Sequence, residues 1–211
     1  MVYCFVRLIL IALTILCYVL FRKKKQQKVF QWKALLIGVP IFAVLFLIPF
    51  ENLFITFPTK ESAIFYSAAS AYGEVLEGEE SAFTVGAGIN YDGSLYLQPM
   101  AALKTEKGYK ILPNQYVYLV GTIYTKQCPF SVYRVLGTDD YYFTTPGGEL
   151  EFEISDEYGG NSIVSAPDIG SFITTYIYHV NYQGSIKDYE FYVDGERAKF
   201  RSVFSFFDFN F

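Results

Sequence analysis

The first fifty residues contain two long apolar runs separated by a short basic segment, and this feature constrains the fold more than any other. Residues 2–21 carry one charged side chain, Arg7, and residues 34–50 carry none. An α-helix rises about 1.5 Å per residue, so roughly 20 apolar residues match a bilayer core about 30 Å thick. The sequence therefore predicts a helical hairpin over residues 1–50, with membrane-spanning helices over residues 2–21 and 34–50.

The segment between the two runs indicates how the hairpin is oriented. Loop 22–33 contains six basic residues, namely Arg22, Lys23, Lys24, Lys25, Lys28 and Lys33. Short loops rich in Lys and Arg stay in the cytoplasm. A cleaved signal peptide would need small residues before its cut, and no such pattern lies at Phe21 or Phe50. We expect a multi-pass protein of the cell membrane, with both its N-terminus and its C-terminal part outside the cytoplasm.

The part of the chain after the hairpin has the opposite charge. Residues 51–211 hold all 21 acidic residues and only ten of the 17 basic ones. Nucleic-acid binding needs a surface rich in Lys and Arg, so the acidic balance argues against it. Cys128 is the only cysteine in this part, which excludes an internal disulfide there and argues against a small disulfide-stapled scaffold.

One helix and about ten strands are predicted in residues 51–211. Thr59 is a suitable N-cap for the helix, Ile64 and Phe65 begin an apolar face that extends to Tyr72, and Gly73 is placed to end it. The segments that follow are rich in Tyr, Val and Ile, as strands prefer. The predicted strands are 81–88, 94–103, 109–112, 115–126, 130–137, 141–145, 149–154, 171–182, 189–193 and 197–203.

Turn residues separate these strands at short intervals. Asp92-Gly93 and Asp194-Gly195 are typical of tight hairpins, and Asp139-Asp140 also reads as a turn. The pattern predicts an α+β fold in which two transmembrane helices precede a mainly antiparallel, β-rich extracytoplasmic domain with one helix. Residues 51–211 are expected to form one domain or two lobes, 59–112 and 113–203.

Two resemblances accompany this prediction. The segment Tyr189-Glu-Phe-Tyr-Val-Asp-Gly195 resembles the last hairpin of immunoglobulin-like sandwiches. The organisation of the chain, two N-terminal apolar runs before an acidic β-rich part, resembles that of small uncharacterised membrane-anchored proteins of Gram-positive bacteria. The second resemblance implies a place in the cell envelope and no particular activity.

Residues for catalysis are scarce. His179 is the only histidine and lies in a predicted strand, whereas Cys128 lies in a predicted turn beside Pro129. A triad of the Ser-His-Asp or Cys-His type would have to use His179, and one His with one Cys does not make a usual zinc site. Gly86-x-Gly88 leads into a hairpin rather than a helix, so it does not predict dinucleotide binding. We expect no catalytic residue, no cofactor and no transition metal.

Carboxylates are the only abundant candidates for chemistry. Alternate residues of a predicted strand, Glu149, Glu151 and Glu153, lie on one face, with Asp156 and Glu157 after them. Oxygen ligands of this kind could hold Ca²⁺, although a solvated strand face explains them as well. Either this group or Glu77, Glu79 and Glu80 could supply the acid and base of a glycan hydrolase.

The C-terminal tail is rich in phenylalanine, with Phe204, Phe206, Phe207, Phe209 and Phe211. These side chains cannot all lie on one face of a strand, so they are candidates for docking to a membrane or a partner as well as for core packing. The leading hypothesis is a non-enzymatic, membrane-anchored domain that binds another envelope protein, a peptide or a wall polymer. The alternatives are an envelope hydrolase with a carboxylate pair and an accessory subunit whose helices contact a membrane complex.

Overall fold

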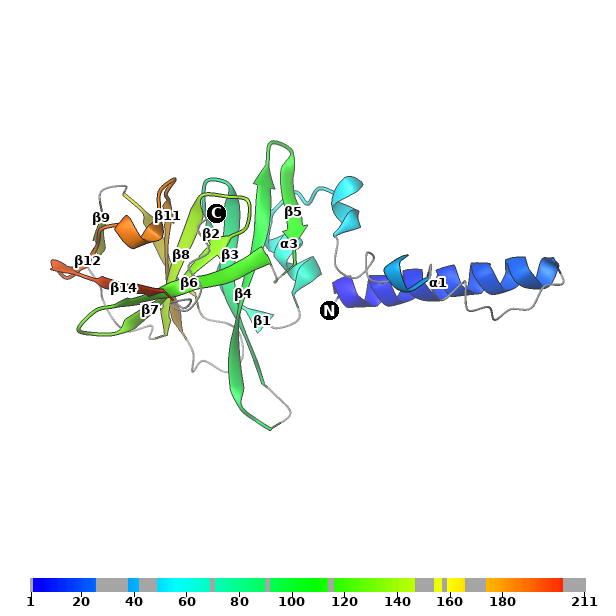
Figure 1. The fold of residues 1–211 in the computed structure, drawn as a ribbon, viewed down its shortest axis with the longest axis horizontal. Helices are drawn as coiled ribbons and strands as arrows, with labels where there is room; N and C mark the ends of the chain where they lie inside the picture. The colour runs from blue at the N-terminus through cyan, green and yellow to red at the C-terminus, as the bar shows by residue number, and fades with distance from the viewer. Residues whose placement is uncertain are drawn as a thin grey trace.

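The chain has an α+β fold in which helix α1 extends away from a layered β domain (Figure 1). All described strand pairs are antiparallel, as the sequence predicts. The computed structural model describes residues 2–25, 38–41, 49–68, 71–89, 92–113, 116–146, 154–156, 159–165 and 174–202.

Helix α1 (Val2–Lys24) has the length and composition of a membrane span over Phe5–Lys24. Only 6% of its most apolar 18-residue window is buried. A core helix of a soluble protein would be mostly buried, so the exposed apolar surface of α1 suits a lipid environment. One N-terminal helix could therefore cross a membrane.

The second predicted span, 34–50, is described only at residues 38–41 and 49–50. Residues 38–41 are helical, and the 3₁₀-helix η1 (Phe50–Leu53) begins where the predicted span ends. Among the described residues, α1 is the only helix that passes the length and composition test for a membrane span. Two crossings and the positions of the termini stay predictions.

Sheet A lies nearest to α1 and is covered on one face by α3 (Lys60–Ser67). Because successive residues of a strand point to opposite faces, Ala82 and Met100 pack under α3 with Ile64, while Phe83 and Ala101 face the next sheet. Its strands are β1 (Ala71–Tyr72), β2 (Leu76–Glu77), β3 (Ser81–Ile89), β4 (Leu95–Thr105) and β5 (Gly108–Leu112).

Sheet B packs against sheet A and also against the small sheet C. Tyr142 and Ile177 of sheet B meet Phe83 of sheet A, while Phe143 stacks on Phe191 of sheet C with ring centroids 4.8 Å apart. The order in sheet B is β10 (Asn161–Ser165), β11 (Thr175–Asn181), β8 (Asp140–Pro146), β7 (Pro129–Val135), β6 (Val117–Tyr124) and β14 (Lys199–Ser202). Sheet C contains β13 (Glu196–Arg197), β12 (Phe191–Val193) and β9 (Ile154–Asp156).

Several predicted elements are confirmed and others are wrong in extent. The turn at Asp92-Gly93 joins β3 to β4 as predicted, with Gly93 in the left-handed region at φ 81°. Helix α3 is shorter than predicted, because Ala68 has an extended backbone and Tyr72 lies in strand β1, where it pairs with Gly86 of β3. Phe65 is 63% exposed instead of lying on a buried face.

The end of the chain differs from the prediction in a similar way. The predicted strand 197–203 is divided at Ala198, whose N–H donates to the carbonyl of Phe191, so β13 and β14 join different sheets. Strand β10 was not predicted, since the glycines before it read as a chain break. The proposed division into lobes 59–112 and 113–203 stays a prediction, although core residues of both segments, among them Phe83 and Tyr142, share one cluster.

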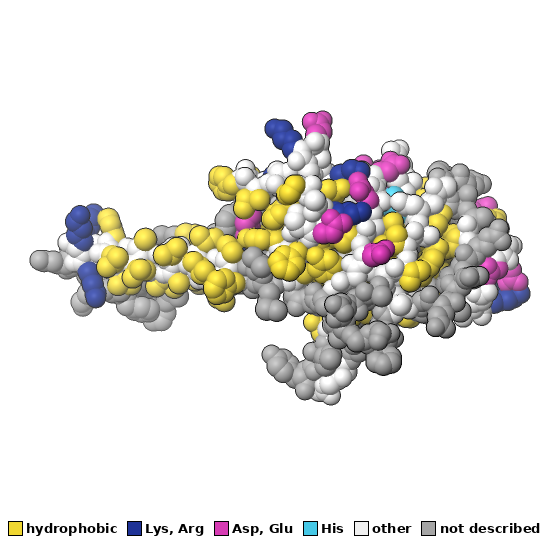
Figure 2. Space-filling model, turned by 180° about the vertical axis from the view of Figure 1, so that it is seen from behind, with side chains coloured by type: hydrophobic (Ala, Val, Ile, Leu, Met, Phe, Trp, Pro, Cys, Tyr) yellow, Lys and Arg dark blue, Asp and Glu magenta, His cyan; other side chains and the backbone are white. Residues whose placement is uncertain are grey.

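A buried ion pair joins α1 to the domain. Arg7 donates from Nε to Glu51 Oε1 at 2.9 Å and from Nη2 to Oε2 at 2.6 Å. The two side chains are 1% and 4% exposed. Helix α1 also contacts α3, and hydrophobic side chains run along α1 up to the domain (Figure 2). The N-terminal end of α1 is therefore attached to the domain, and its basic C-terminal end lies away from it.

Candidate functional site

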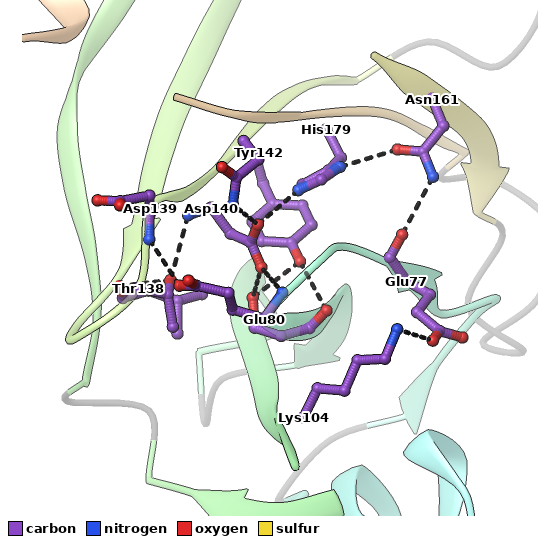
Figure 3. Close-up of polar contacts among 12 residues, drawn as sticks. Glu77, Glu80, Lys104, Thr138, Asp139, Asp140, Tyr142, Asn161 and His179 are labelled. Atoms are coloured by element: carbon purple, nitrogen blue, oxygen red, sulfur yellow. Dashed lines mark hydrogen bonds and ion pairs between the residues drawn. The ribbon is translucent and has the colours of Figure 1, made fainter. Parts of the chain in front are cut away.

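The register of sheet B brings the single histidine together with an aspartate and two asparagines. His179 on β11 lies opposite Asn161 of β10 and Tyr142 of β8, and Asn181 lies opposite Asp140. Opposed residues and residues two apart in a strand share one face of a sheet. These five side chains therefore lie on the face of sheet B that meets sheet A. Figure 3 labels four of them, Asp140, Tyr142, Asn161 and His179, with their contacts.

The carboxylate of Asp140 is fully buried and receives four hydrogen bonds. Its Oδ2 accepts from Ser81 Oγ at 2.6 Å and from the Glu80 N–H at 3.0 Å, both in sheet A or the turn before it. Its Oδ1 lies 2.9 Å from His179 Nε2 and accepts from Asn181 Nδ2 at 3.0 Å. Asp140 therefore connects sheets A and B.

Competing effects act on the pKa of Asp140. Burial raises the pKa, but the hydrogen bonds from His179, Ser81 and Asn181 and the charge of His179 together lower it to about 2. Hydrogen bonds donated to the charged form favour that form. Asp140 is consequently a stable, buried anion.

The hydrogen bonds of Asn161 determine the protonation of His179. Asn161 Nδ2 donates to the carbonyl of Glu77 at 3.1 Å, which leaves Asn161 Oδ1 facing His179 Nδ1 at 2.9 Å. An amide oxygen only accepts, so Nδ1 must carry a proton. Nε2 faces the Asp140 carboxylate and also donates. His179 is therefore a doubly protonated imidazolium, assigned from the hydrogen-bond network.

The phenol of Tyr142 and the small size of Gly78 complete the network. Tyr142 Oη lies 2.9 Å from Ser81 Oγ and 3.2 Å from the Ser81 carbonyl, to which it donates. Burial, followed by the charge of Asp140, raises the Tyr142 pKa well above its ordinary value. A Cβ on Gly78 would lie 2.5 Å from Tyr142 Oη and 2.7 Å from both Asp140 Oδ2 and His179 Nε2. The close approach of the two sheets thus requires glycine.

A pocket of about 280 Å³ opens beside this network, lined in part by Glu77, Gly78, Glu79, Asn161 and His179. The Glu77 carboxylate is bound to Lys104 Nζ at 2.6 Å, and Lys60 lies 3.7 Å from it. The hydrogen bond from Lys104 is the largest cause of the lowered Glu77 pKa. The pocket therefore has polar walls, a positive histidine whose charge Asp140 balances, and acidic residues in its lining.

The network does not have the order of a catalytic triad. In such a triad the histidine lies between the nucleophile and the acid, whereas here Asp140 lies between Ser81 and His179. Both nitrogens of His179 are already engaged, and a carboxylate with a pKa of about 2 is a weak base. The geometry is that of a polar connection between sheets that also forms part of the wall of the pocket.

Most of the predicted site residues lie outside the described part of the chain. This holds for four of the calcium candidates, Glu149, Glu151, Glu153 and Glu157, and for the docking candidates Phe204, Phe206, Phe207, Phe209 and Phe211. Asp156, the fifth calcium candidate, lies in β9 opposite Phe191. Among the described residues, no group of three or more His, Cys, Asp or Glu could hold a metal ion.

The carboxylates considered for hydrolysis are partly engaged elsewhere. Glu77 binds Lys104, and Glu80 Oε2 accepts the N–H of Asp139 at 3.0 Å. Glu77 and Glu79 both line the pocket. Cys128 lies in the β6–β7 turn and packs against the core between sheets B and C, so the structure does not bring it together with His179.

Sequence reasoning missed Asp140, because Asp139-Asp140 was read only as a turn. Asp140 is in fact the first residue of β8 and precedes the aromatic run Tyr141-Tyr142-Phe143. A charged residue next to a buried run is a signal of a paired charge, and His179 was the only imidazole available to it. Comparison of the chain with protein families, characterised proteins and solved structures finds no match.

Proposed function

We propose that this chain is a membrane-anchored binding protein with two N-terminal membrane crossings and a non-enzymatic β-rich domain outside the cytoplasm. The observation that carries the binding role is the pocket beside the Asp140–His179 pair, whose wall includes His179 held by hydrogen bonds at both ring nitrogens. Pre-formed pockets with a few placed polar groups are typical of ligand sites. The ligand is a small polar segment of an envelope compound that carries an amine.

The choice of an amine follows from the charges in the pocket lining. Glu77 and Glu79 are acidic, and the one basic lining group, His179, is balanced by Asp140 behind it. The charge of Glu77 is partly neutralised by its ion pair with Lys104. Of the two carboxylates, Glu79 is therefore the one more available to a ligand. An ammonium group would meet Glu79 first and would then reach the main-chain carbonyls of the glycine-rich wall.

The proposed topology is supported by the junction between α1 and the domain. Arg7 binds Glu51, whereas Lys24 lies 17 residues further along α1, a distance of roughly 26 Å at 1.5 Å per residue. The chain must cover this distance again to reach Pro49. If α1 crosses a bilayer, residues 34–50 cross it in the opposite direction, and loop 22–33 is cytoplasmic by its positive charge.

The binding role is tested by calorimetric titration of the detergent-solubilised full chain with soluble amine-bearing wall peptides. Wild type is expected to bind, and Glu79→Lys is expected to bind at least tenfold more weakly. Glu196→Lys makes the same charge change in sheet C, away from the pocket, and is expected to bind like wild type. No binding by wild type, or equal binding by Glu79→Lys, would disprove this pocket as the site. Cleavage of the peptides, detected by mass spectrometry, would establish a hydrolase instead.

The topology is tested by labelling single cysteines from outside intact cells. In a variant without Cys4, Cys17 and Cys128, Asp194→Cys is expected to react with an impermeant maleimide and Gln26→Cys is not. Labelling of Gln26→Cys alone would place the β domain in the cytoplasm and would remove the envelope from consideration.

A further inference from the structure

The end of the domain that meets α1 exposes large apolar side chains. Leu53 at the end of η1 is 78% exposed, Phe54 after it is 83% exposed, and Phe65 on α3 is 63% exposed. Other large apolar side chains of the β domain, such as Leu136 in the turn after β7 and Tyr124 in β6, are 51% and 47% exposed. We call Leu53, Phe54 and Phe65 the basal apolar surface. Single exposed apolar residues are ordinary, but a group of this exposure marks an interaction surface.

The segment that carries Leu53 and Phe54 is held in place from several sides. The Asn52 side chain pairs with the Ile111 main chain, donating to its carbonyl at 2.8 Å and accepting from its N–H at 3.0 Å. Lys110 Nζ donates to the carbonyls of Asn52 at 2.5 Å and Ile55 at 2.8 Å. Together with the Arg7–Glu51 pair, these bonds hold the segment to β5 and α1 while its apolar side chains face outward.

The basal apolar surface lies on elements next to α1, whose own apolar side chains are exposed. Both elements that carry it touch α1, since η1 contains Glu51, the partner of Arg7, and α3 contacts α1 directly. The first turns of α1 are themselves exposed, with Phe5 at 66% and Leu8 at 57%. Figure 2 shows hydrophobic side chains along α1 and on the adjoining end of the domain. A bilayer that surrounds α1 as far as Phe5 would therefore reach η1.

We propose that the basal apolar surface docks on the lipid bilayer, with Leu53, Phe54 and Phe65 in the interfacial layer of the leaflet that α1 enters. Phenylalanine and leucine on the apolar side of a membrane-bound element are typical of interfacial insertion. A cleft of about 510 Å³ beside Leu53 and Phe54 also contains Lys107, Lys110 and Glu106. Because Glu106 offsets part of the lysine charge, docking is driven mainly by apolar contact.

This inference rests on the proposed crossing of the membrane by α1, but it does not depend on the pocket or on which side the domain faces. It makes the anchored domain a rigid body seated on the bilayer. A domain held away from the membrane on a flexible stalk would leave the basal apolar surface in water. The two arrangements differ in how deeply Phe54 and Phe65 lie in lipid.

Tryptophan fluorescence in vesicles that contain brominated phosphatidylcholine tests the proposal on the full chain. Trp32, the only tryptophan, is replaced by Phe. Single reporters are then introduced as Phe54→Trp and Phe65→Trp on the basal apolar surface, as Leu13→Trp in α1, and as Tyr124→Trp in sheet B. All four replaced side chains are at least 47% exposed, so tryptophan should be accommodated at each position.

We expect lipid brominated near the headgroup to reduce the emission of Phe54→Trp and Phe65→Trp at least twofold. Deeply brominated lipid should quench Leu13→Trp most, and neither lipid should quench Tyr124→Trp. Quenching of Leu13→Trp with basal reporters that behave like Tyr124→Trp would overturn docking and leave the anchor intact. Absence of quenching for Leu13→Trp would overturn the membrane crossing and the docking together.

Discussion

Two buried ion pairs lie in the described part of the chain, and they differ in the number of hydrogen bonds that each carboxylate receives. At the junction with α1, Glu51 takes two hydrogen bonds from Arg7. Between sheets A and B, Asp140 takes bonds from His179, Asn181, Ser81 and the main chain of Glu80. The first carboxylate is held by one side chain, whereas the second is held by residues of two strands, β3 and β11, and by a turn.

The difference predicts different consequences when each pair is broken. Removing one partner of a buried pair leaves an uncompensated charge, which costs the most where no water can reach it. Arg7 has a long, flexible side chain at one end of α1 and can turn toward an interface. His179 is 5% exposed and is confined between Asn161 and Tyr142. Breaking the Arg7–Glu51 pair should destabilise only the junction with α1. Breaking the Asp140–His179 pair should lower the unfolding free energy of the whole domain.

The largest effect is expected for Asp140→Asn. The substitution keeps the shape of the side chain but leaves the His179 imidazolium without its counter-charge, so we expect a loss of about 3–5 kcal/mol of unfolding free energy. Urea denaturation of the full chain in detergent, followed by circular dichroism of the β domain, measures it. Asp139→Asn is the matched control, because Asp139 is 34% exposed in its pair with Arg134 and should cost no more than about 1 kcal/mol. Equal effects of the two variants would contradict a global role for the network.

A smaller and local effect is expected at the junction. Arg7→Gln, Glu51→Gln and the double variant form a thermodynamic cycle, and we expect a coupling free energy of about 1.5–3 kcal/mol for these charged hydrogen bonds. Hydrogen exchange of the Phe54 and Ile55 amides, which donate to the Glu51 carbonyl, reports the local opening. Exchange in the strands of sheet B should not change. Faster exchange throughout sheet B would show that the junction also supports the domain core.

The sequence predicted the long apolar helix α1 and much of the β structure because both depend on local patterns. The Asp92-Gly93 turn depends only on a left-handed backbone at Gly93. The N-cap of α3 depends only on the N–H of Ser62, which donates to the Thr59 side chain three residues earlier. Asp140 could not be placed in this way. Its role depends on the pairing of β8 with β11 and on the approach of sheet A, contacts that join residues far apart in the chain.

The same reasoning explains the wrong boundary of α3. Phe65 and Tyr72 fall at helical spacing, but pairing of Tyr72 with Gly86 draws residues 71–72 into sheet A. Tertiary pairing overrides helix propensity here. Helical periodicity predicts that Phe65 is buried, but its side chain is exposed and forms part of the basal apolar surface. Sequence patterns commonly disagree with the structure at sites that serve interaction.

The dependence of the unfolding free energy on pH below about pH 4 should report on the Asp140 carboxylate. The Asp140 pKa is lowered from 3.8 to about 2 in the folded protein. A lowered carboxyl pKa stabilises the fold above the unfolded value and loses this contribution as pH falls through the folded value. We expect Asp140 to contribute roughly 2 kcal/mol that disappears between about pH 4 and pH 2. Acid unfolding of wild type and Asp140→Asn measures the difference, and parallel pH profiles of the two proteins would refute it.

The smallest effect on stability is expected where a carboxylate is half exposed, at the pair of Lys104 and Glu77. Both side chains are 39% exposed, so Lys104→Met should change the unfolding free energy by less than about 1 kcal/mol. The hydrogen bond from Lys104 is, however, the main cause of the lowered Glu77 pKa, and its loss should move this pKa upward in an NMR titration.

Lys104→Met also tests the link between this exposed pair and the pocket. Without Lys104, the Glu77 carboxylate loses its shortest ion pair and is more available to an amine in the pocket. We therefore expect wall peptides to bind a few-fold more tightly near neutral pH. Lys126→Met removes the partner of Glu196, which lies in sheet C away from the pocket, and should leave binding unchanged. Weaker binding by Lys104→Met would mean that the ligand presents an anion to Lys104, and the assignment of an amine would then be wrong. The two buried pairs would keep their roles in either case, because neither depends on what the pocket holds.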